Sequence, residues 1–549
     1  MKTETHPDTE SAPSTDSLRT LLVGLDGVCR DVLDARGDGV VPTLREILDE
    51  GTAAPLESQI PPWTPSAWPS LYTGVNPGKH GVYSFLRFDG YDWDVVNATD
   101  VGEFALWELV DRAGMTSVVV NVPVTHPPRE FDGALVPGYT APEDPECHPP
   151  GLLDDLRAEL GEYRLYDDAT SDATGEAAVE GYRQLTEMRG AAFRYLVDRF
   201  EPAFGFLQFQ QTDTVFHEHP EEDAIVDGVF RAVDREVGRT LAACDPDVVV
   251  LASDHGIGPY GGHEFRVNSF LRDHGAVETV AGEGGMPSWD SIARNRLRGD
   301  EETGGGSALF ARLTRAAARA GVTSQRIATV VRRLGIEDLV VSIAPVDAIR
   351  AGTERVDFAA STAYLRDRVE LGVRLNVAGR EPDGVVSEAE YEANRDELIA
   401  ALSAVETPDD TPVFSDVLRR EELYHGPYVE DAPDIVVVPA AFDQYISASV
   451  RAEQFGPPSE PWNHKLDGIV AVAGDVDTEA DLTGAHIFDV APTVLATLGV
   501  PVSDRMDGDP LPVVTDHDTA TYEAYESRAV EESRPDVEQR LAEMGYLER

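Results

Sequence analysis

Residues 20–27, TLLVGLDG, form a short apolar run that ends at Asp26. A run of this length bounded by glycine predicts a buried β-strand over residues 21–25. Similar runs at 117–122, 204–208, 248–252, 435–438 and 469–472 predict further strands, and residues 41–50 and 225–243 are amphipathic helix candidates. Strands alternating with helices are typical of a mostly parallel sheet covered on both faces. The sequence therefore predicts an α/β fold.

Acidic and imidazole side chains follow several of these strands. Ligands of open α/β sheets bind beyond the carboxyl ends of the strands. A single Asp after a strand is usually a helix cap, but three strand ends that also supply two histidines indicate a metal site. Imidazole and carboxylate together favour zinc over calcium or magnesium. The candidate ligands are Asp26, Asp213, His217, Asp254, His255 and His464, the last of them in a loop before a strand.

The candidate nucleophile lies in residues 60–81, IPPWTPSAWPSLYTGVNPGKHG. Thr64 followed by Pro65 predicts a helix N-cap with proline at the first helical position. The Thr64 hydroxyl would then lie at the positive end of the helix, beside backbone N–H groups that can bind a phosphoryl oxygen. An ordinary N-cap has the same local pattern. Pro69 removes a hydrogen bond early in this helix.

An ordered series of motifs resembles the type I phosphodiesterase/nucleotide pyrophosphatase branch of the alkaline phosphatase superfamily. The series is Asp26, TPSAW, DTVFH, SDHG, and His464 with KLDGI and IFDVAPTVLATLG. The sequence is similar in particular to the prokaryotic phosphohydrolase and phosphomutase-like members of this branch. The resemblance implies an alkaline-phosphatase-like fold and hydrolysis of a phosphate ester, most simply a diester, through a phospho-threonine intermediate. It also implies two divalent metal ions, zinc or manganese. One would be held by Asp213, His217 and His464, and the other by Asp26, Asp254, His255 and Thr64.

Some residues depart from the family pattern, and other functions are therefore considered beside the phosphodiesterase. Ala67 stands where animal nucleotide pyrophosphatases place a phosphate-binding Asn, so nucleotide specificity does not carry over. Lys79 is a weak candidate for that donor, and a surface lysine after a turn is the favoured interpretation. His80, His263 and His425 are interpreted as structural, the alternative being that they orient metal ligands. A phosphomutase with two manganese ions, or a non-catalytic binding protein with this fold, is the alternative function; a sulfatase is excluded by the lack of C/S-x-P-x-R at Thr64.

The charge of the chain is strongly one-sided. Among 549 residues, 100 are Asp or Glu and 45 are Lys or Arg, and the formal net charge is −55. Lys2, Lys79 and Lys465 are the three lysines. An acidic surface of this kind stays hydrated in concentrated salt, where self-repulsion is screened. We hypothesise a halophilic cytoplasm, an ordinary acidic protein being the alternative, and we expect no nucleic-acid partner.

The termini and one internal segment differ from the rest. Residues 1–17 are predicted to be a disordered acidic arm without a signal peptide, and no run is long enough to span a membrane. Residues 18–280 and 356–515 are the predicted catalytic domain, and 516–549 a C-terminal acidic helix. Residues 281–355 are a predicted helical insertion, rich in arginine: either a cap that binds an anionic substrate or a helical excursion paired with surface carboxylates. Three cysteines predict no disulfide framework. The sequence leaves the oligomeric state and the small phosphorylated substrate open.

Overall fold

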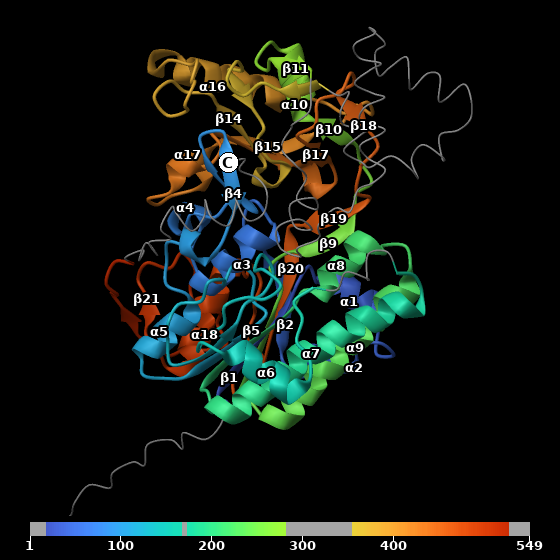
Figure 1. Ribbon diagram of the computed structural model, residues 1–549, viewed down its shortest axis with the longest axis vertical. Coiled ribbons are helices and arrows are strands. Elements are labelled where there is room, and N and C mark those ends of the chain that lie inside the picture. The colour runs from blue at the N-terminus through green and yellow to red at the C-terminus, as the bar shows by residue number, and fades with distance from the viewer. Residues whose placement is uncertain (1–17, 167–172, 282–353, 526–549) are drawn as a thin grey trace, which may run out of the picture.

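The computed structural model describes residues 18–166, 173–281 and 354–525 (Figure 1). Its central sheet has seven strands in the order β2-β20-β8-β1-β7-β5-β6. All neighbouring pairs are parallel except those of β20, which runs against β2 and β8. The predicted fold class, a mostly parallel sheet with helices on both faces, is confirmed. The strands are β1 (Thr20–Leu25), β2 (Thr52–Glu57), β5 (Ser117–Val120), β6 (Gly133–Val136), β7 (Phe204–Phe209), β8 (Val248–Ala252) and β20 (Asp467–Gly474).

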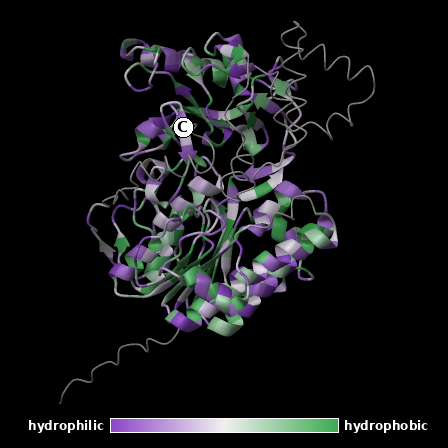
Figure 2. Cartoon of the chain, in the orientation of Figure 1, coloured by the Kyte–Doolittle hydropathy of each residue, from purple (hydrophilic) through white to green (hydrophobic). Residues whose placement is uncertain are grey.

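Both faces of the central sheet are buried, which explains the continuous apolar runs of its strands. Leu21, Val23 and Leu25 of β1 point into one core and Leu22 points into the other. Helices α2 (Pro42–Glu50), α7 (Glu176–Phe200) and α9 (Asp223–Cys244) cover the first face. Helices α3 (Thr64–Thr73), α5 (Leu106–Arg112) and α18 (Val490–Leu498) cover the second. In Figure 2 the strands between these two layers are the most hydrophobic part of the lower lobe.

A second lobe stands at one end of the central sheet (Figure 1). Its four-stranded antiparallel sheet has the order β13-β14-β16-β15 and its own apolar core. The predicted strand at 435–438 exists as β16, and it belongs to this lobe, where it pairs with β14 and β15. The elements are β13 (Ala363–Tyr364), β14 (Gly372–Leu375), β15 (Phe414–Arg419), β16 (Ile435–Pro439), β17 (Tyr445–Ser447), α10 (Val267–Asp273), α16 (Glu388–Ser403) and α17 (Arg420–Leu423).

The predicted insertion leaves and rejoins the fold at one place. Strand β11 (Thr279–Ala281) pairs antiparallel with β12 (Glu354–Val356), so that Ala281 lies opposite Glu354. The remainder of that insertion lies outside the described residues, as do the acidic arm at 1–17 and residues 526–549. At Thr519–Ala520, where we expected a helix, the chain forms strand β22 because it pairs with β21 (Val502–Ser503). Across the described part of the chain, no helix has the length and apolar character needed to cross a bilayer.

Two further groups of elements connect the lobes near the carboxyl edge of the central sheet. Strand β19 (Trp462–Lys465) pairs antiparallel with β9 (Gly256–Pro259), and β10 (Glu264–Arg266) pairs with β17 and with β18 (Phe455–Gly456). Other elements are α1 (Arg30–Arg36), α4 (Pro77–His80), β3 (Leu86–Asp89), β4 (Asp92–Val95), α6 (Leu152–Leu160) and α8 (Gln211–Glu218).

Candidate metal centre and nucleophile

Three neighbouring strands bring four of the predicted ligands to one edge of the sheet. Asp26 follows β1, Asp254 and His255 follow β8, and Asp213 lies on α8 directly after β7. In the strand register, Gly24 lies opposite Ala252 and Leu25 opposite Phe209, so these strands end side by side. Asp26, Asp254 and His255 are fully buried, and Asp213 is 5% exposed.

The other two predicted ligands join Asp213. His464 lies on β19, not in a loop as expected, and pairing with Ile257 of β9 holds it over the sheet edge. Its Nε2 atom is 3.1 Å from Nε2 of His217 and 3.6 Å from Oδ1 of Asp213. His217 Nε2 is 3.3 Å from the same Asp213 oxygen. One carboxylate and two imidazoles therefore face a common point.

A second group adjoins the first. His255 Nε2 is 3.2 Å from Asp254 Oδ2 and 3.6 Å from Asp26 Oδ1, and the Thr64 hydroxyl is 3.4 Å from that same Asp26 oxygen. The imidazole rings of His255 and His464 stack with centroids 3.7 Å apart, which joins the two groups. The structure thus places all six predicted ligands and the predicted nucleophile in one cluster, which is buried except at His217, whose side chain is 28% exposed.

Hydrogen bonds orient three of these ligands, His464, His255 and Asp26, so that one atom of each faces the cluster. His464 Nδ1 donates to the Pro62 carbonyl and His255 Nδ1 to the Gly256 carbonyl, each at 2.9 Å. Because a carbonyl only accepts, each Nδ1 carries the proton and each Nε2 presents a lone pair. Asp26 Oδ2 accepts from Trp68 Nε1 at 2.8 Å and from Gln208 Nε2 at 2.9 Å, which turns Oδ1 towards the cluster.

The donor atoms fit divalent cations. Asp213 Oδ1, Asp254 Oδ2 and His255 Nε2 are buried and have no hydrogen-bond partner within the described residues. Each such unsatisfied group costs about 1–3 kcal/mol of stability unless something else binds it. Two sets of these side chains have ligand atoms close enough to share an ion: Asp213, His255 and His464, and Asp26, Asp254 and His255. Carboxylate oxygens with imidazole nitrogens are the ligands typical of zinc and manganese.

The carboxylates of the cluster repel one another unless a cation is bound. Burial raises the pKa of Asp26 well above its usual value, and repulsion by Asp254 and Asp213 raises it further. Burial also raises the pKa of Asp254 to about 6. Burial opposes ionisation of Asp213 too, but His217 outweighs it and lowers the pKa of Asp213. A bound dication would favour the ionised carboxylates and relieve this repulsion.

Thr64 is the first residue of α3, and Trp63 is the N-cap. We expected the helix to begin one residue later, with Thr64 itself as the cap. The Thr64 side chain makes no capping hydrogen bond and reaches Asp26 instead, so its hydroxyl is available at the helix N-terminus. Thr64 is 2% exposed, and the Trp63 ring packs on His464 with centroids 5.1 Å apart.

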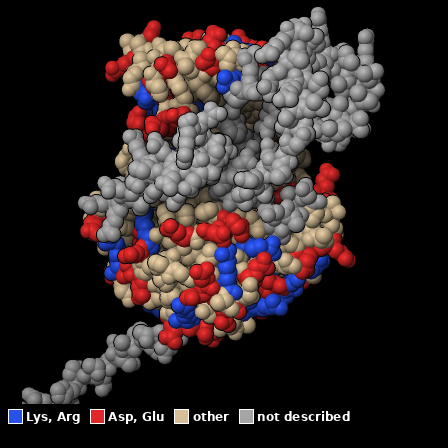
Figure 3. Space-filling view, in the orientation of Figure 1, with Lys and Arg blue, Asp and Glu red and all other residues tan. Residues whose placement is uncertain are grey.

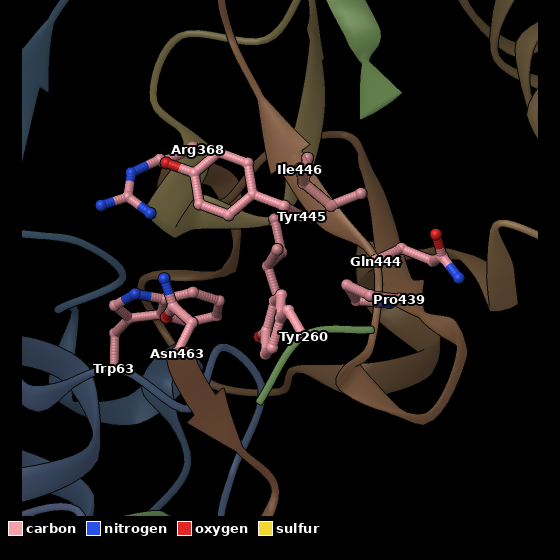
Figure 4. A pocket seen from close by; sticks show the side chains of 9 residues that line it. Trp63, Tyr260, Arg368, Pro439, Gln444, Tyr445, Ile446 and Asn463 are labelled. Atoms are coloured by element: carbon pink, nitrogen blue, oxygen red, sulfur yellow. The ribbon is translucent and has the colours of Figure 1, made fainter. Parts of the chain in front are cut away.

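A small pocket with a cavity volume of about 10 Å³, room for about one water molecule, lies beside the cluster, between the lobes (Figure 4). Trp63 and Asn463, the residues before Thr64 and His464, form its floor, and Tyr445 and Arg368 of the second lobe stand opposite. Glu460 joins the two sides: it accepts from Tyr445 Oη at 3.0 Å and from Asn463 Nδ2 at 2.6 Å. This pocket was not predicted from the sequence. The lining residues are Trp63, Tyr260, Arg368, Leu371, Pro439, Gln444, Tyr445, Ile446 and Asn463.

Lys79, the weak candidate for a substrate-binding donor, contacts other parts of the protein. Its ammonium forms an ion pair with Asp507 and donates to the Arg505 carbonyl at 2.7 Å, which ties α4 to the C-terminal part of the chain. These contacts account for Lys79 without a substrate. The three histidines interpreted as structural also have protein partners: His80 contacts Ser70, His425 contacts Asp507, and His263 contacts Asp409.

Comparison with protein families decides the broad assignment. The family of type I phosphodiesterases/nucleotide pyrophosphatases matches residues 20–336, more than half of the chain. The chain belongs to this family. This type I phosphodiesterase/nucleotide pyrophosphatase family member is a hydrolase of phosphoric esters, and the resemblance inferred from its motifs is confirmed. A comparison with curated proteins gives no significant match.

Solved structures of similar topology include two kinds of enzyme. Phosphonoacetate hydrolase from Sinorhizobium meliloti, in complex with phosphonoformate, is 17% identical, with 88% of this chain and 96% of that chain covered and a TM-score of 0.49. Murine ectonucleotide pyrophosphatase/phosphodiesterase 5, in complex with AMP, is 12% identical, with 92% and 98% covered and a TM-score of 0.48. At these identities and TM-scores the likenesses carry no information about the substrate of this chain.

Proposed function

We propose that this family member is a phosphodiesterase that uses Thr64 as its nucleophile and two divalent metal ions, zinc or manganese. The observation that supports it most is the buried cluster itself. Six side chains from distant parts of the sequence meet beside the Thr64 hydroxyl, and three of their ligand atoms lack any hydrogen bond within the described residues. Burying such groups is costly unless they serve a ligand.

The six side chains divide into two sets, as the family resemblance implies. Asp213, His217 and His464 would hold one ion; Asp26, Asp254, His255 and the Thr64 oxygen would hold the other. His255 also lies within reach of the first set. When bound, the two ions supply Lewis acidity that lowers the pKa of a hydroxyl and neutralises charge on the phosphoryl group.

The residues of this chain then have separate roles in a two-step reaction. In the first step the Thr64 oxygen bonds to phosphorus, the bond from phosphorus to the leaving alcohol breaks, and phospho-threonine forms. In the second step water cleaves that ester, which releases the phosphate product and restores the Thr64 hydroxyl. Asp26 Oδ1 orients that hydroxyl from 3.4 Å, and the N-terminus of α3 presents its positive dipole to the phosphoryl oxygens.

The rest of the ester would lie on the Trp63 and Asn463 side of the cluster, where the pocket now has room for about one water molecule and its walls must move apart to admit a substrate. Trp63 and Asn463 adjoin the reacting groups in sequence, and aromatic rings of both lobes form its walls. Ala67 is fully buried and has no side-chain donor for the phosphate, so we do not restrict the substrate to nucleotides. The arginine-rich insertion stays a hypothetical cap.

The halophilic cytoplasm also remains our proposal. On the face shown in Figure 3, acidic and basic side chains are interspersed over both lobes. Many surface arginines contact two acids, as Arg183 contacts Glu180 and Glu187. Since acids outnumber bases by 100 to 45, a large unpaired negative charge is left for solvent and salt to screen.

An assay in molar salt tests the proposal. Bis-p-nitrophenyl phosphate and the corresponding monoester are compared with and without added zinc or manganese. We expect metal-dependent diesterase activity that Thr64→Ala lowers by roughly a thousandfold or more. Thr73→Ala, in the same helix and equally buried, is the matched control and should keep its activity. Undiminished turnover in Thr64→Ala would contradict the assigned nucleophile, and transfer of phosphate to sugar without its release would favour a phosphomutase.

A further inference from the structure

A chain of buried polar side chains runs along the carboxyl edge of the sheet and ends on Asp26. Arg189 Nε donates to Asn121 Oδ1 at 2.9 Å, and Asn121 Nδ2 donates to Gln208 Oε1 at 2.7 Å. Gln208 Nε2 then donates to Asp26 Oδ2 at 2.9 Å. Arg189 and Gln208 are fully buried, and Asn121 is 3% exposed. The chain crosses three adjacent strands, β5, β7 and β1, and begins on helix α7.

The direction of every hydrogen bond in this chain is fixed by its two ends. A guanidinium only donates and a carboxylate only accepts, so both intervening amides must point their oxygens towards Arg189 and their NH₂ groups towards Asp26. The amide dipoles are therefore aligned, with their positive ends on the carboxylate. Bonds aligned in this way strengthen one another in a buried setting.

The position of Arg189 needs an explanation. A buried guanidinium is costly unless it is paired, and no ion pair of Arg189 occurs within residues 18–166, 173–281 and 354–525. Its remaining donors go to the carbonyls of Arg164 and Leu165, and its guanidinium lies 5.0 Å from the Tyr163 ring. Glu143 is the carboxylate whose charge Arg189 stabilises through space. The hydrogen-bonded chain in addition connects the guanidinium to Asp26.

The backbone at Asn121 also suits an asparagine. Asn121 has φ +67°, the left-handed region that Asn adopts more readily than most non-glycine residues. A Cβ at Gly138 would lie 2.0 Å from the Asn121 carbonyl oxygen, so a side chain there is excluded. The left-handed backbone and the two hydrogen bonds of the side-chain amide both favour Asn at this position.

We propose that Arg189, acting through Asn121 and Gln208, is a positioning residue for Asp26. Gln208 and Trp68 both donate hydrogen bonds to Asp26 Oδ2. Asp26 is therefore left with one oxygen, Oδ1, that faces Thr64 and His255 and can bind a metal ion. This inference rests on the proposed metal-dependent function. Removing a hydrogen-bond partner that orients a metal ligand typically weakens metal affinity by about 10- to 100-fold.

The test measures metal binding rather than turnover. Metal-free full-length protein in molar salt is titrated with zinc against a chelating dye, and its thermal unfolding is recorded. Arg189→Met should bind one of two zinc ions at least about tenfold more weakly, with the other unchanged. Arg395→Met, a buried arginine of the second lobe that pairs with Glu421, is the control: it should lower stability and leave both affinities unchanged.

The outcomes separate the inference from the proposed function. If wild-type protein binds no zinc or manganese, the proposed function fails and the inference with it. If wild type binds two ions and Arg189→Met binds both equally well, only the inference fails. Should Arg189→Met not fold, Gln208→Met interrupts the same chain while keeping the buried charge, and it should show the same selective loss; unchanged affinity there overturns the proposal.

Discussion

Substitution of Gly27 by alanine should separate backbone strain from disruption of the metal cluster. Gly27 follows Asp26 and has φ +66°, which costs an L-residue about 1–2 kcal/mol. An added Cβ would lie 2.8 Å from Asp213 Oδ1 and 3.0 Å from Asp213 Cβ. Ordinary contacts are longer, so Asp213 would have to move by roughly half an ångström. That is the tolerance within which a site's ligands must be held.

The matched control is Gly499→Ala. Gly499 ends α18 with φ +70°, and a Cβ there would have no neighbour within 4 Å. Both variants should lose about 1–2 kcal/mol of unfolding free energy from the backbone alone. Gly27→Ala should in addition bind zinc at least about tenfold more weakly, which corresponds to about 1.4 kcal/mol.

The assay is a zinc titration of metal-free protein in molar salt, paired with thermal unfolding of the same samples. Comparing the two variants removes the shared cost of a left-handed alanine. If both variants lose stability equally and bind zinc as tightly as wild type does, Asp213 Oδ1 does not hold a metal on the side facing Gly27, and the proposed ligand set is wrong.

Three more predictions concern stability. The melting temperature should rise between low and molar salt because screening relieves a net charge of −55, and an unchanged value would contradict the halophilic hypothesis. Burial lowers the pKa of His80 to about 3. Its stabilising effect should therefore be complete above pH 6.5 and decline as the pH falls towards 3; His80→Gln should flatten that slope in thermal melts, and equal slopes would refute it. Asp434→Asn should cost about 3–5 kcal/mol in urea unfolding because Arg380 loses a buried partner, whereas exposed Glu392→Gln should change little; equal effects would argue against a buried pair.

The sequence predicted the sheet and the cluster well because both depend on residue type. Apolar runs located five of the seven central strands to within two residues, since burial on both faces leaves few polar positions within them. Strands β2 and β6 were not predicted. Asp26, Asp213, Asp254 and His255 follow predicted strands, so their convergence at one edge follows from parallel topology, whereas His464 precedes a strand. The direction of β20 could not be predicted, because an apolar run is the same when read in either direction. The family motifs supplied the pairing of ligands into two sets.

The second lobe was missed for a related reason. The run at 435–438 indicates burial, but nothing in it indicates which sheet it joins, and β16 pairs with β14 and β15. The polar chain behind Asp26 did leave a signal. Gln208 interrupts an otherwise apolar strand, and Arg189 lies on the buried side of α7. A polar residue inside a predicted buried strand indicates a partner, and following that signal leads to Asn121.

The orientation of the ligands has no comparable signal in the sequence. His464 and His255 are held by the carbonyls of Pro62 and Gly256, and every residue type supplies a carbonyl. Gly256 is instead constrained by packing, because a Cβ there would lie 2.1 Å from the Asp467 carbonyl oxygen. The identity of a residue that orients a ligand through its backbone is therefore set by the space around it. Only a residue that orients a ligand through its side chain, as Gln208 does for Asp26, links its own identity to the geometry of the cluster.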